Sequence, residues 1–217
     1  MPSARDINLG LCPPPEIAFP DSEFRQRHRR IRERMMEQGF DVLYLTAPES
    51  RYYVDGYNSD WYQAQSPADW HALSGVAIHV DHDKVITFER EVNVVLVNMT
   101  TLGDDTRILR GETTMAEFIA RELEREGWLG GNVGIERYSY RPNPVVSDLL
   151  SASLTEKGCQ VTDCSHILRE VRSIKSALEL SYVRKAAAIG DAGMRAALAT
   201  IGAGVTELDV YVEIVSA

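Results

Sequence analysis

The stretch that decides the fold lies toward the C-terminal end of the chain and reads RSIKSALELSYVRKAA, residues 172–187. Within it, Ser176 and Glu179 form the pattern of a capping box, in which a serine hydroxyl and a glutamate carboxylate satisfy the free amides of a helix start. Apolar residues then recur about every seven residues, which predicts a helix over 176–200 with one face turned toward a partner. The first prediction is therefore a long amphipathic helix.

A tight turn and a second helix are predicted by the next segment, IGAGVTELDV, residues 201–210. Gly202 and Gly204 indicate the end of the long helix, because glycine adopts left-handed backbone angles without a steric penalty. Thr206 and Asp209 form another capping box, which predicts that a second helix begins there.

The order of these pieces resembles the entry into the catalytic domain of the pita-bread hydrolases, which include creatinase, prolidases, Xaa-Pro aminopeptidases and methionine aminopeptidases. The matching pieces are the Arg-Ser-Ile-Lys-Ser run of 172–176, the YVRKAA segment of 182–187 and the Gly-x-Thr-Glu turn of 204–207. Upstream, PESRYYVDGY (residues 48–57) is similar to a motif of the creatinase and prolidase N-terminal domain, with Asp55 where that family usually has threonine or serine.

The resemblance implies a division of the chain into three parts. We expect an N-terminal extension over 1–20, a creatinase/prolidase-type N-terminal domain over 21–165, and a linker with the first helices of a truncated pita-bread catalytic domain over 166–217. The expected fold class is α/β, a sandwich of helices around a mixed sheet.

Strand and helix patterns alternate along the chain, as that fold requires. Helices are expected at 22–38, 49–54, 90–99, 114–126 and 144–157. Strands are expected at 41–45, 73–80, 84–88, 106–109, 132–136 and 159–163. The apolar residues of the segment 90–99 fit both a helix and a strand, and a helix is favoured because no turn signal precedes the segment. The first helix is expected to start at Asp21 or Ser22 and to stop at Gly39.

Composition limits the partners and the location. The net charge of −9 and the isoelectric point of about 5.1 argue against nucleic acid or an anionic membrane as a partner. No apolar run approaches the roughly 20 residues of a membrane span, and three prolines at 13–15 interrupt any signal peptide. We therefore expect a cytoplasmic protein. The basic cluster over 25–34 is interpreted as the solvated face of an amphipathic helix.

The resemblance also implies a chemistry that this chain does not carry. Enzymes of the family hold two divalent metal ions, manganese, cobalt or zinc, through two aspartates, a histidine and two glutamates in the second half of the catalytic domain. Creatinase uses a histidine and bound substrate without a metal, but the segment 208–217 holds no histidine. We therefore assign no catalytic residue, metal ligand or cofactor to the chain, and we expect it to be inactive on its own.

One upstream segment gathers residues that bind metals in other proteins. It holds His71, His79, His82, Asp69, Asp81 and Asp83. A metal site and ordinary turn chemistry both fit these residues, and turn chemistry is favoured because Asp-His-Asp side chains bond readily to their own backbone. Cys12, Cys159 and Cys164 have neither zinc-ribbon nor redox spacing, so we interpret them as free thiols.

An aromatic segment over 57–71 is the candidate substrate-binding region. Its candidate residues are Tyr57, Trp61, Tyr62 and His71. Aromatic rings with a few polar groups suit the rim of a small-ligand site, and in related dimeric enzymes the corresponding loop approaches the catalytic pocket of the neighbouring subunit. The alternative, which we favour, is a structural role in which these rings cover the sheet or a dimer contact.

The sequence thus predicts the dimerisation and substrate-restricting domain of an Xaa-Pro peptidase or prolidase-like metallohydrolase, a homodimer that acts on a peptide or small-amide substrate. The alternatives are a fragment of a creatinase-like amidinohydrolase or small-amide hydrolase, and a non-catalytic protein-interaction module of the same fold. A continuation of about 180 residues with the metal ligands in order would favour the enzyme. The apolar stripe of 180–201 is expected to self-associate or to fold back on the chain.

Overall fold

The computed structural model describes residues 17–58, 73–102, 105–111, 113–139 and 143–217. Contacts divide the chain into two compact units, Met1–Val171 and Arg172–Ala217. Each unit is described by itself below.

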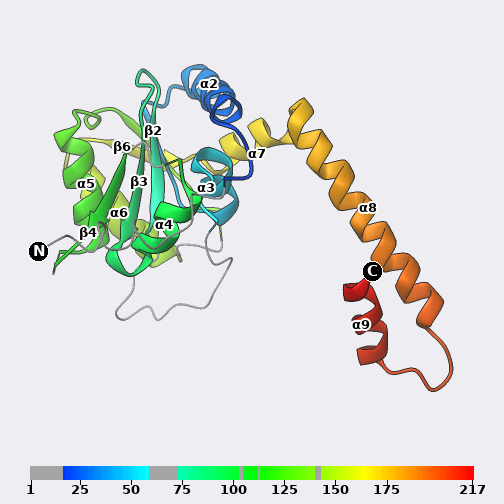
Figure 1. Cartoon of the computed structure of the whole chain (residues 1–217). Coiled ribbons are helices and arrows are strands. Elements are labelled where there is room, and N and C mark those ends of the chain that lie inside the picture. The colour runs from blue at the N-terminus through cyan, green and yellow to red at the C-terminus, as the bar shows by residue number, and fades with distance from the viewer. Residues whose placement is uncertain (1–16, 59–72, 103–104, 112, 140–142) are drawn as a thin grey trace, which may run out of the picture. The chain divides into compact units, whose positions relative to one another are not determined.

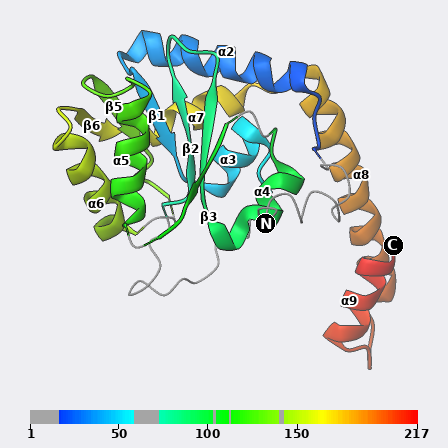
Figure 2. The same ribbon diagram turned by 60° about the vertical axis from the view of Figure 1, so that its left-hand side comes forward.

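The first unit is built on a six-stranded sheet with the order β4-β3-β2-β1-β5-β6 (Figures 1 and 2). The strands are β1 (Val42–Leu45), β2 (Gly75–His79), β3 (Val85–Arg90), β4 (Thr106–Leu109), β5 (Asn132–Ile135) and β6 (Gln160–Asp163). Strand β2 runs antiparallel to both of its neighbours, while the other three pairings are parallel. The mixed sheet of the expected α/β sandwich is confirmed.

Helices cover both faces of this sheet. They are α2 (Asp21–Gln38), α3 (Pro48–Asp55), the 3-10 turn η1 (Glu91–Asn93), α4 (Val94–Thr100), α5 (Met115–Arg125), α6 (Pro144–Thr155) and α7 (Ser165–Ser173). Side chains alternate across a strand, so Val42 and Tyr44 of β1 pack with α5 and α6, while Leu43 and Leu45 pack with α2, α3 and α7. The unit therefore has two apolar layers, one on each face.

Local signals explain where most helices begin and end. Helix α2 stops at Gly39, which adopts the left-handed conformation at φ 72°. Helix α5 begins with the complete capping box of Thr114 and Glu117. The segment 90–99 is helical, as favoured, because β3 continues through Arg90 and the chain then turns into η1 and α4. Helix α2 begins at Asp21, as expected, and its N-cap is Pro20, which makes no side-chain cap bond.

The second unit consists of α8 (Ala177–Thr200) and α9 (Glu207–Ser216). The predicted capping boxes at Ser176 and Thr206 are both formed. Small residues on α8 let α9 approach, since a β-carbon added at Gly193 would lie 3.2 Å from Ile214 Cγ2. Much of the apolar stripe of α8 stays exposed: Leu180, Val183, Met194 and Leu198 are between 38% and 69% exposed. Its self-association stays a prediction.

Among the residues that the structure describes, no helix is both long and apolar enough to cross a membrane.

Candidate functional site

Helix α3 and strand β3 place a cluster of charged side chains inside the first unit. Arg51 and Asp55 lie one turn apart on α3, and Glu89 lies near the end of β3. Their exposed fractions are 4%, 3% and 0%. Burial of charge at this level is costly unless each charge has a partner, so the contacts of each group decide what the cluster can do.

Glu89 is the best-satisfied member of the cluster. Its Oε2 lies 3.2 Å from Nη1 of Arg51. Its Oε1 accepts hydrogen bonds from the hydroxyl of Ser74, from the backbone N–H of Arg90 at 2.9 Å and from Nδ2 of Asn93 at 3.2 Å. Burial alone would raise the pKa of Glu89, but the charge of Arg51 and these hydrogen bonds outweigh burial and hold the pKa below its ordinary value.

Asp55 has weaker support. It accepts hydrogen bonds from the Thr87 hydroxyl at 2.7 Å and from the backbone N–H of Tyr57 at 2.9 Å. Burial raises the pKa of Asp55, and the charge of Arg51 together with these two bonds only partly opposes that effect. Arg51 is thus a single cation that serves two buried carboxyl groups, and its Nε and Nη2 have no hydrogen-bond partner among the described residues.

Tyr57 is the one candidate substrate-binding residue that the structure describes. Its ring lies against Arg51, with the guanidinium carbon 3.7 Å from the ring centroid, and only 1% of the side chain is exposed. Burial raises the pKa of its phenol, and Glu89 adds to the effect. Trp61, Tyr62 and His71 lie outside the described residues. A substrate role for the four residues therefore stays a prediction.

The sequence contains weak signals for this cluster. Asp55 stood out only as a departure from the family motif. Arg51 precedes it by four residues, a spacing that places both side chains on one face of a helix. Glu89 interrupts an otherwise apolar strand of sequence VITFER. Because all of these groups are buried, the cluster can hold α3 and Tyr57 in position, and it does not present an acid or base to solvent.

The histidines of the β2–β3 hairpin show turn chemistry. Nδ1 of His79 accepts the backbone N–H of Asp81 at 3.0 Å, and the His79 and His82 rings lie 4.5 Å apart beside Trp128. Burial, followed by the charge of His82, lowers the pKa of His79. Asp69 and His71 lie outside the described residues. Within the described ranges, no group of three or more His, Cys, Asp or Glu residues is arranged to hold a metal ion.

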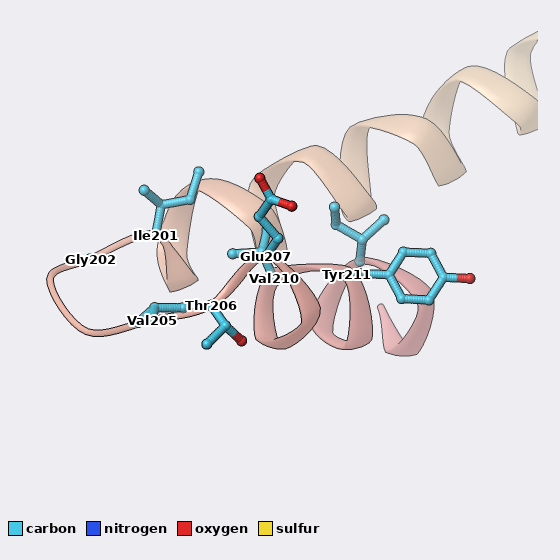
Figure 3. A pocket seen from close by; sticks show the side chains of 8 residues that line it. Ile201, Gly202, Val205, Thr206, Glu207, Val210 and Tyr211 are labelled. Carbon is cyan, nitrogen blue, oxygen red and sulfur yellow. The ribbon is translucent and has the colours of Figure 1, made fainter.

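The second unit has a hollow of about 370 Å³ between the end of α8 and α9. Figure 3 shows Ile201 and Val205 beside the turn and Val210 and Tyr211 on α9. The lining is mainly apolar, and Glu207 is its one charged residue. It is suited to the packing of apolar side chains rather than to catalysis.

Comparison with protein families connects this fold to a known domain. The creatinase/prolidase N-terminal domain matches residues 27–174. The chain belongs to this family. The matched range takes in the sheet, the buried cluster around Arg51 and most of the helices that cover them.

Two curated relatives come from Sinorhizobium fredii. The uncharacterized hydrolase/peptidase y4tM is 28% identical over 202 residues, covering 89% of this chain and 49% of the relative. The uncharacterized hydrolase/peptidase y4tL is 28% identical over 217 residues, covering 90% of this chain and 50% of the relative. The chain therefore spans about half the length of the curated relatives it matches.

Solved structures share the fold. The dipeptidase PepE of Mycobacterium ulcerans matches with a TM-score of 0.66 at 18% identity, over 91% of this chain and 49% of that one. The prolidase of Pyrococcus horikoshii OT3 matches with a TM-score of 0.62 at 19% identity, over 87% and 47%. The N-terminal domain of the cytoplasmic peptidase PepQ of Mycobacterium tuberculosis matches with a TM-score of 0.52 at 13% identity, over 67% and 98%.

Proposed function

We propose that this chain forms the N-terminal part of a hydrolase that cleaves a C–N bond next to proline, as an Xaa-Pro peptidase or prolidase does. The observation that carries the proposal is the family match over residues 27–174 together with coverage of about half of relatives named as hydrolases or peptidases. In this proposal the first unit restricts substrate size and forms homodimer contacts, and the location is cytoplasmic.

The catalytic chemistry in this proposal belongs to the half of the protein that the chain does not cover. A pair of divalent ions, manganese, cobalt or zinc, would activate water and polarise the scissile carbonyl there. The chain itself would contribute Tyr57, Trp61, Tyr62 and His71 to the mouth of the partner subunit's pocket. The buried charges of Arg51, Asp55 and Glu89 support this assignment for Tyr57 only indirectly, by fixing its position.

A creatinase-like amidinohydrolase or small-amide hydrolase is the second candidate. The family that matches the chain takes its description from creatinase as well as from prolidase. A non-catalytic interaction module of the same fold is the third.

The decisive experiment compares this chain with the product of the whole open reading frame that encodes it, called the longer protein below. Both are assayed with Xaa-Pro dipeptides, creatine and simple amides, with manganese, cobalt or zinc added. We expect the longer protein to hydrolyse an Xaa-Pro dipeptide in a reaction that a chelator stops, while the chain alone stays at the buffer rate. Hydrolysis of creatine or a simple amide alone would favour the second candidate. A longer protein without activity on any of these substrates would favour the interaction module.

A substitution tests the substrate-mouth assignment in the active longer protein. We expect Trp61→Ala to change kcat/KM several-fold while the midpoint of thermal unfolding stays within a few degrees, as for a side chain that contributes little to the core. A large loss of thermal stability with unchanged kinetics would show that the ring is structural.

A further inference from the structure

Glu136 is a buried carboxyl group whose partners among the described residues include no cation. It follows β5 directly, and only 5% of its side chain is exposed. Its partners are three neutral donors at the start of α3. The backbone N–H groups of Thr46 and Ala47 donate to Oε2 at 2.8 and 2.7 Å, and the Ser50 hydroxyl donates to Oε1.

This carboxyl group accepts the backbone N–H groups that lie directly before α3. The N-cap residue of α3 is Ala47, which has no side-chain oxygen and makes no side-chain cap bond. Helix starts leave backbone N–H groups that need acceptors, and Glu136 reaches the start of α3 from a strand 89 residues away along the chain. The carboxyl group therefore joins the end of β5 to α3.

A neutral carboxylic acid can keep the same contacts, although each of the three donors favours the ionised form and opposes the effect of burial. The two amides both donate to Oε2, so Oε2 can act as the carbonyl oxygen of the neutral acid. Oε1 faces the Ser50 hydroxyl, which is able to accept the acid proton as well as donate one. Protonation from water therefore loses neither backbone bond, whereas ionisation buries a charge that three neutral donors must stabilise by themselves.

The charged and titratable neighbours do not compensate that charge. Glu49 on α3 carries the same sign and disfavours ionisation of Glu136. Cys164, before α7, is fully buried, and burial raises the pKa of its thiol well above the ordinary value, so it stays neutral. Arg137 follows Glu136 in the chain, but its guanidinium pairs with Asp148 at 2.6 Å on the surface.

We propose that Glu136 makes the docking of α3 onto the sheet proton-linked: the buried site without a neighbouring cation favours the neutral acid, and ionisation of Glu136 weakens the docking. The helix carries Arg51 and Asp55 and leads into Tyr57, so weaker docking of α3 also loosens the buried cluster that Arg51 and Asp55 form with Glu89. Burial raises the pKa of Glu136 to about 7, with the Ser50 and backbone bonds opposing the shift, which sets the transition in the neutral range. The proposal does not depend on the substrate of the longer protein.

The experiment follows the intact chain by NMR and amide hydrogen exchange from about pH 5 to about pH 8. We expect the amide resonances of Thr46 and Ala47 to move together in one transition near neutral pH. After correction for the intrinsic exchange rate, protection of the α3 amides should fall on the order of fiftyfold across this range, because opening lets Glu136 ionise in water. The amides of α5 serve as the internal control and should change much less.

Two variants distinguish the ionisation of Glu136 itself from the influence of its charged neighbour Glu49. Glu136→Gln keeps an acceptor for the two amides but cannot ionise, so both pH transitions should disappear. Glu49→Gln removes the like charge, so the transitions should remain and move to lower pH. If Glu136→Gln does not fold, the resonances of Thr46 and Ala47 in the unsubstituted chain decide.

Three results would overturn the proposal. The first is a transition of the Thr46 and Ala47 resonances confined below about pH 5, the range of an ordinary glutamate. The second is a Glu136→Gln chain that keeps the neutral transition. The third is an equal loss of protection in α5 and α3, which would mean that ionisation loosens the whole unit and not α3.

Discussion

Two buried glutamates contact the same helix and are stabilised in opposite ways. Glu89 pairs with Arg51 in the middle of α3 and has its pKa lowered, whereas Glu136 meets only neutral donors at the start of α3 and has its pKa raised to about 7. Both are at most 5% exposed, so burial does not distinguish them. The difference lies in the partners: the charge of Arg51 and several hydrogen bonds hold the pKa of Glu89 down, whereas the described partners of Glu136 are neutral donors that burial outweighs.

The largest effect is expected from removal of the Arg51 guanidinium. Arg51→Met keeps most of the side-chain volume but leaves Glu89 and Asp55 without a cation, so we expect a loss of about 3–5 kcal/mol in the free energy of unfolding at neutral pH. Urea denaturation measures it, and Arg121→Met, at a partly exposed surface position, is the matched control. The double variant Arg51→Met with Glu89→Gln should recover part of the loss. A loss below about 1 kcal/mol would mean that Arg51 does little to stabilise the charge of Glu89, and Glu89 would then not differ from Glu136 in this respect.

The next effect concerns pH. The folded-state pKa of Glu136, about 7, lies above the ordinary value of 4.5, so its contribution to stability is fully present below about pH 4.5 and is lost as the pH rises through 7. The expected loss is about 3 kcal/mol. Comparison of the free energies of unfolding of the unsubstituted chain and Glu136→Gln at several pH values isolates this term. A constant difference between the two chains at all pH values would contradict it.

A smaller effect is expected at Asp55, which shares Arg51 with Glu89. Thr87→Val removes the hydroxyl that donates to Asp55 at 2.7 Å while keeping the shape of the side chain. A buried acceptor that loses one of its donors costs about 1–2 kcal/mol. Denaturation at neutral and acid pH should show a larger loss at neutral pH, because the lost bond favours the ionised carboxylate. An equal loss at both pH values would show that Asp55 is neutral throughout.

The smallest effect is expected at Ser50. Ser50→Ala removes one of the three donors to Glu136 and should cost about 1 kcal/mol. Since the Ser50 bond lowers the pKa of Glu136, the transition of the Thr46 and Ala47 amides should also move to higher pH, and NMR titration measures that shift. An unchanged or lower transition would mean that the hydroxyl does not stabilise the ionised form.

Much of the fold could be predicted because its signals are local. Capping boxes at Ser176 and Thr206 act over three residues, and each is formed as predicted. The hairpin of β2 and β3 and the helix over 90–99 followed from patterns within about ten residues. The alternation of strands and helices predicted the mixed sheet, which is confirmed. The substrate role of Tyr57, Trp61, Tyr62 and His71 stays a prediction.

The sequence by itself determined most of the helices and strands and the family. Only the tertiary structure decided which carboxyl groups keep their charge. Glu89 contacts Arg51, 38 residues away in the sequence, and Glu136 contacts Thr46, 90 residues away. No local pattern links residues so far apart. The physical reason is that the pKa of a buried group depends on the partners that the fold brings within a few ångströms, and those partners exist only after the sheet and α3 have packed together.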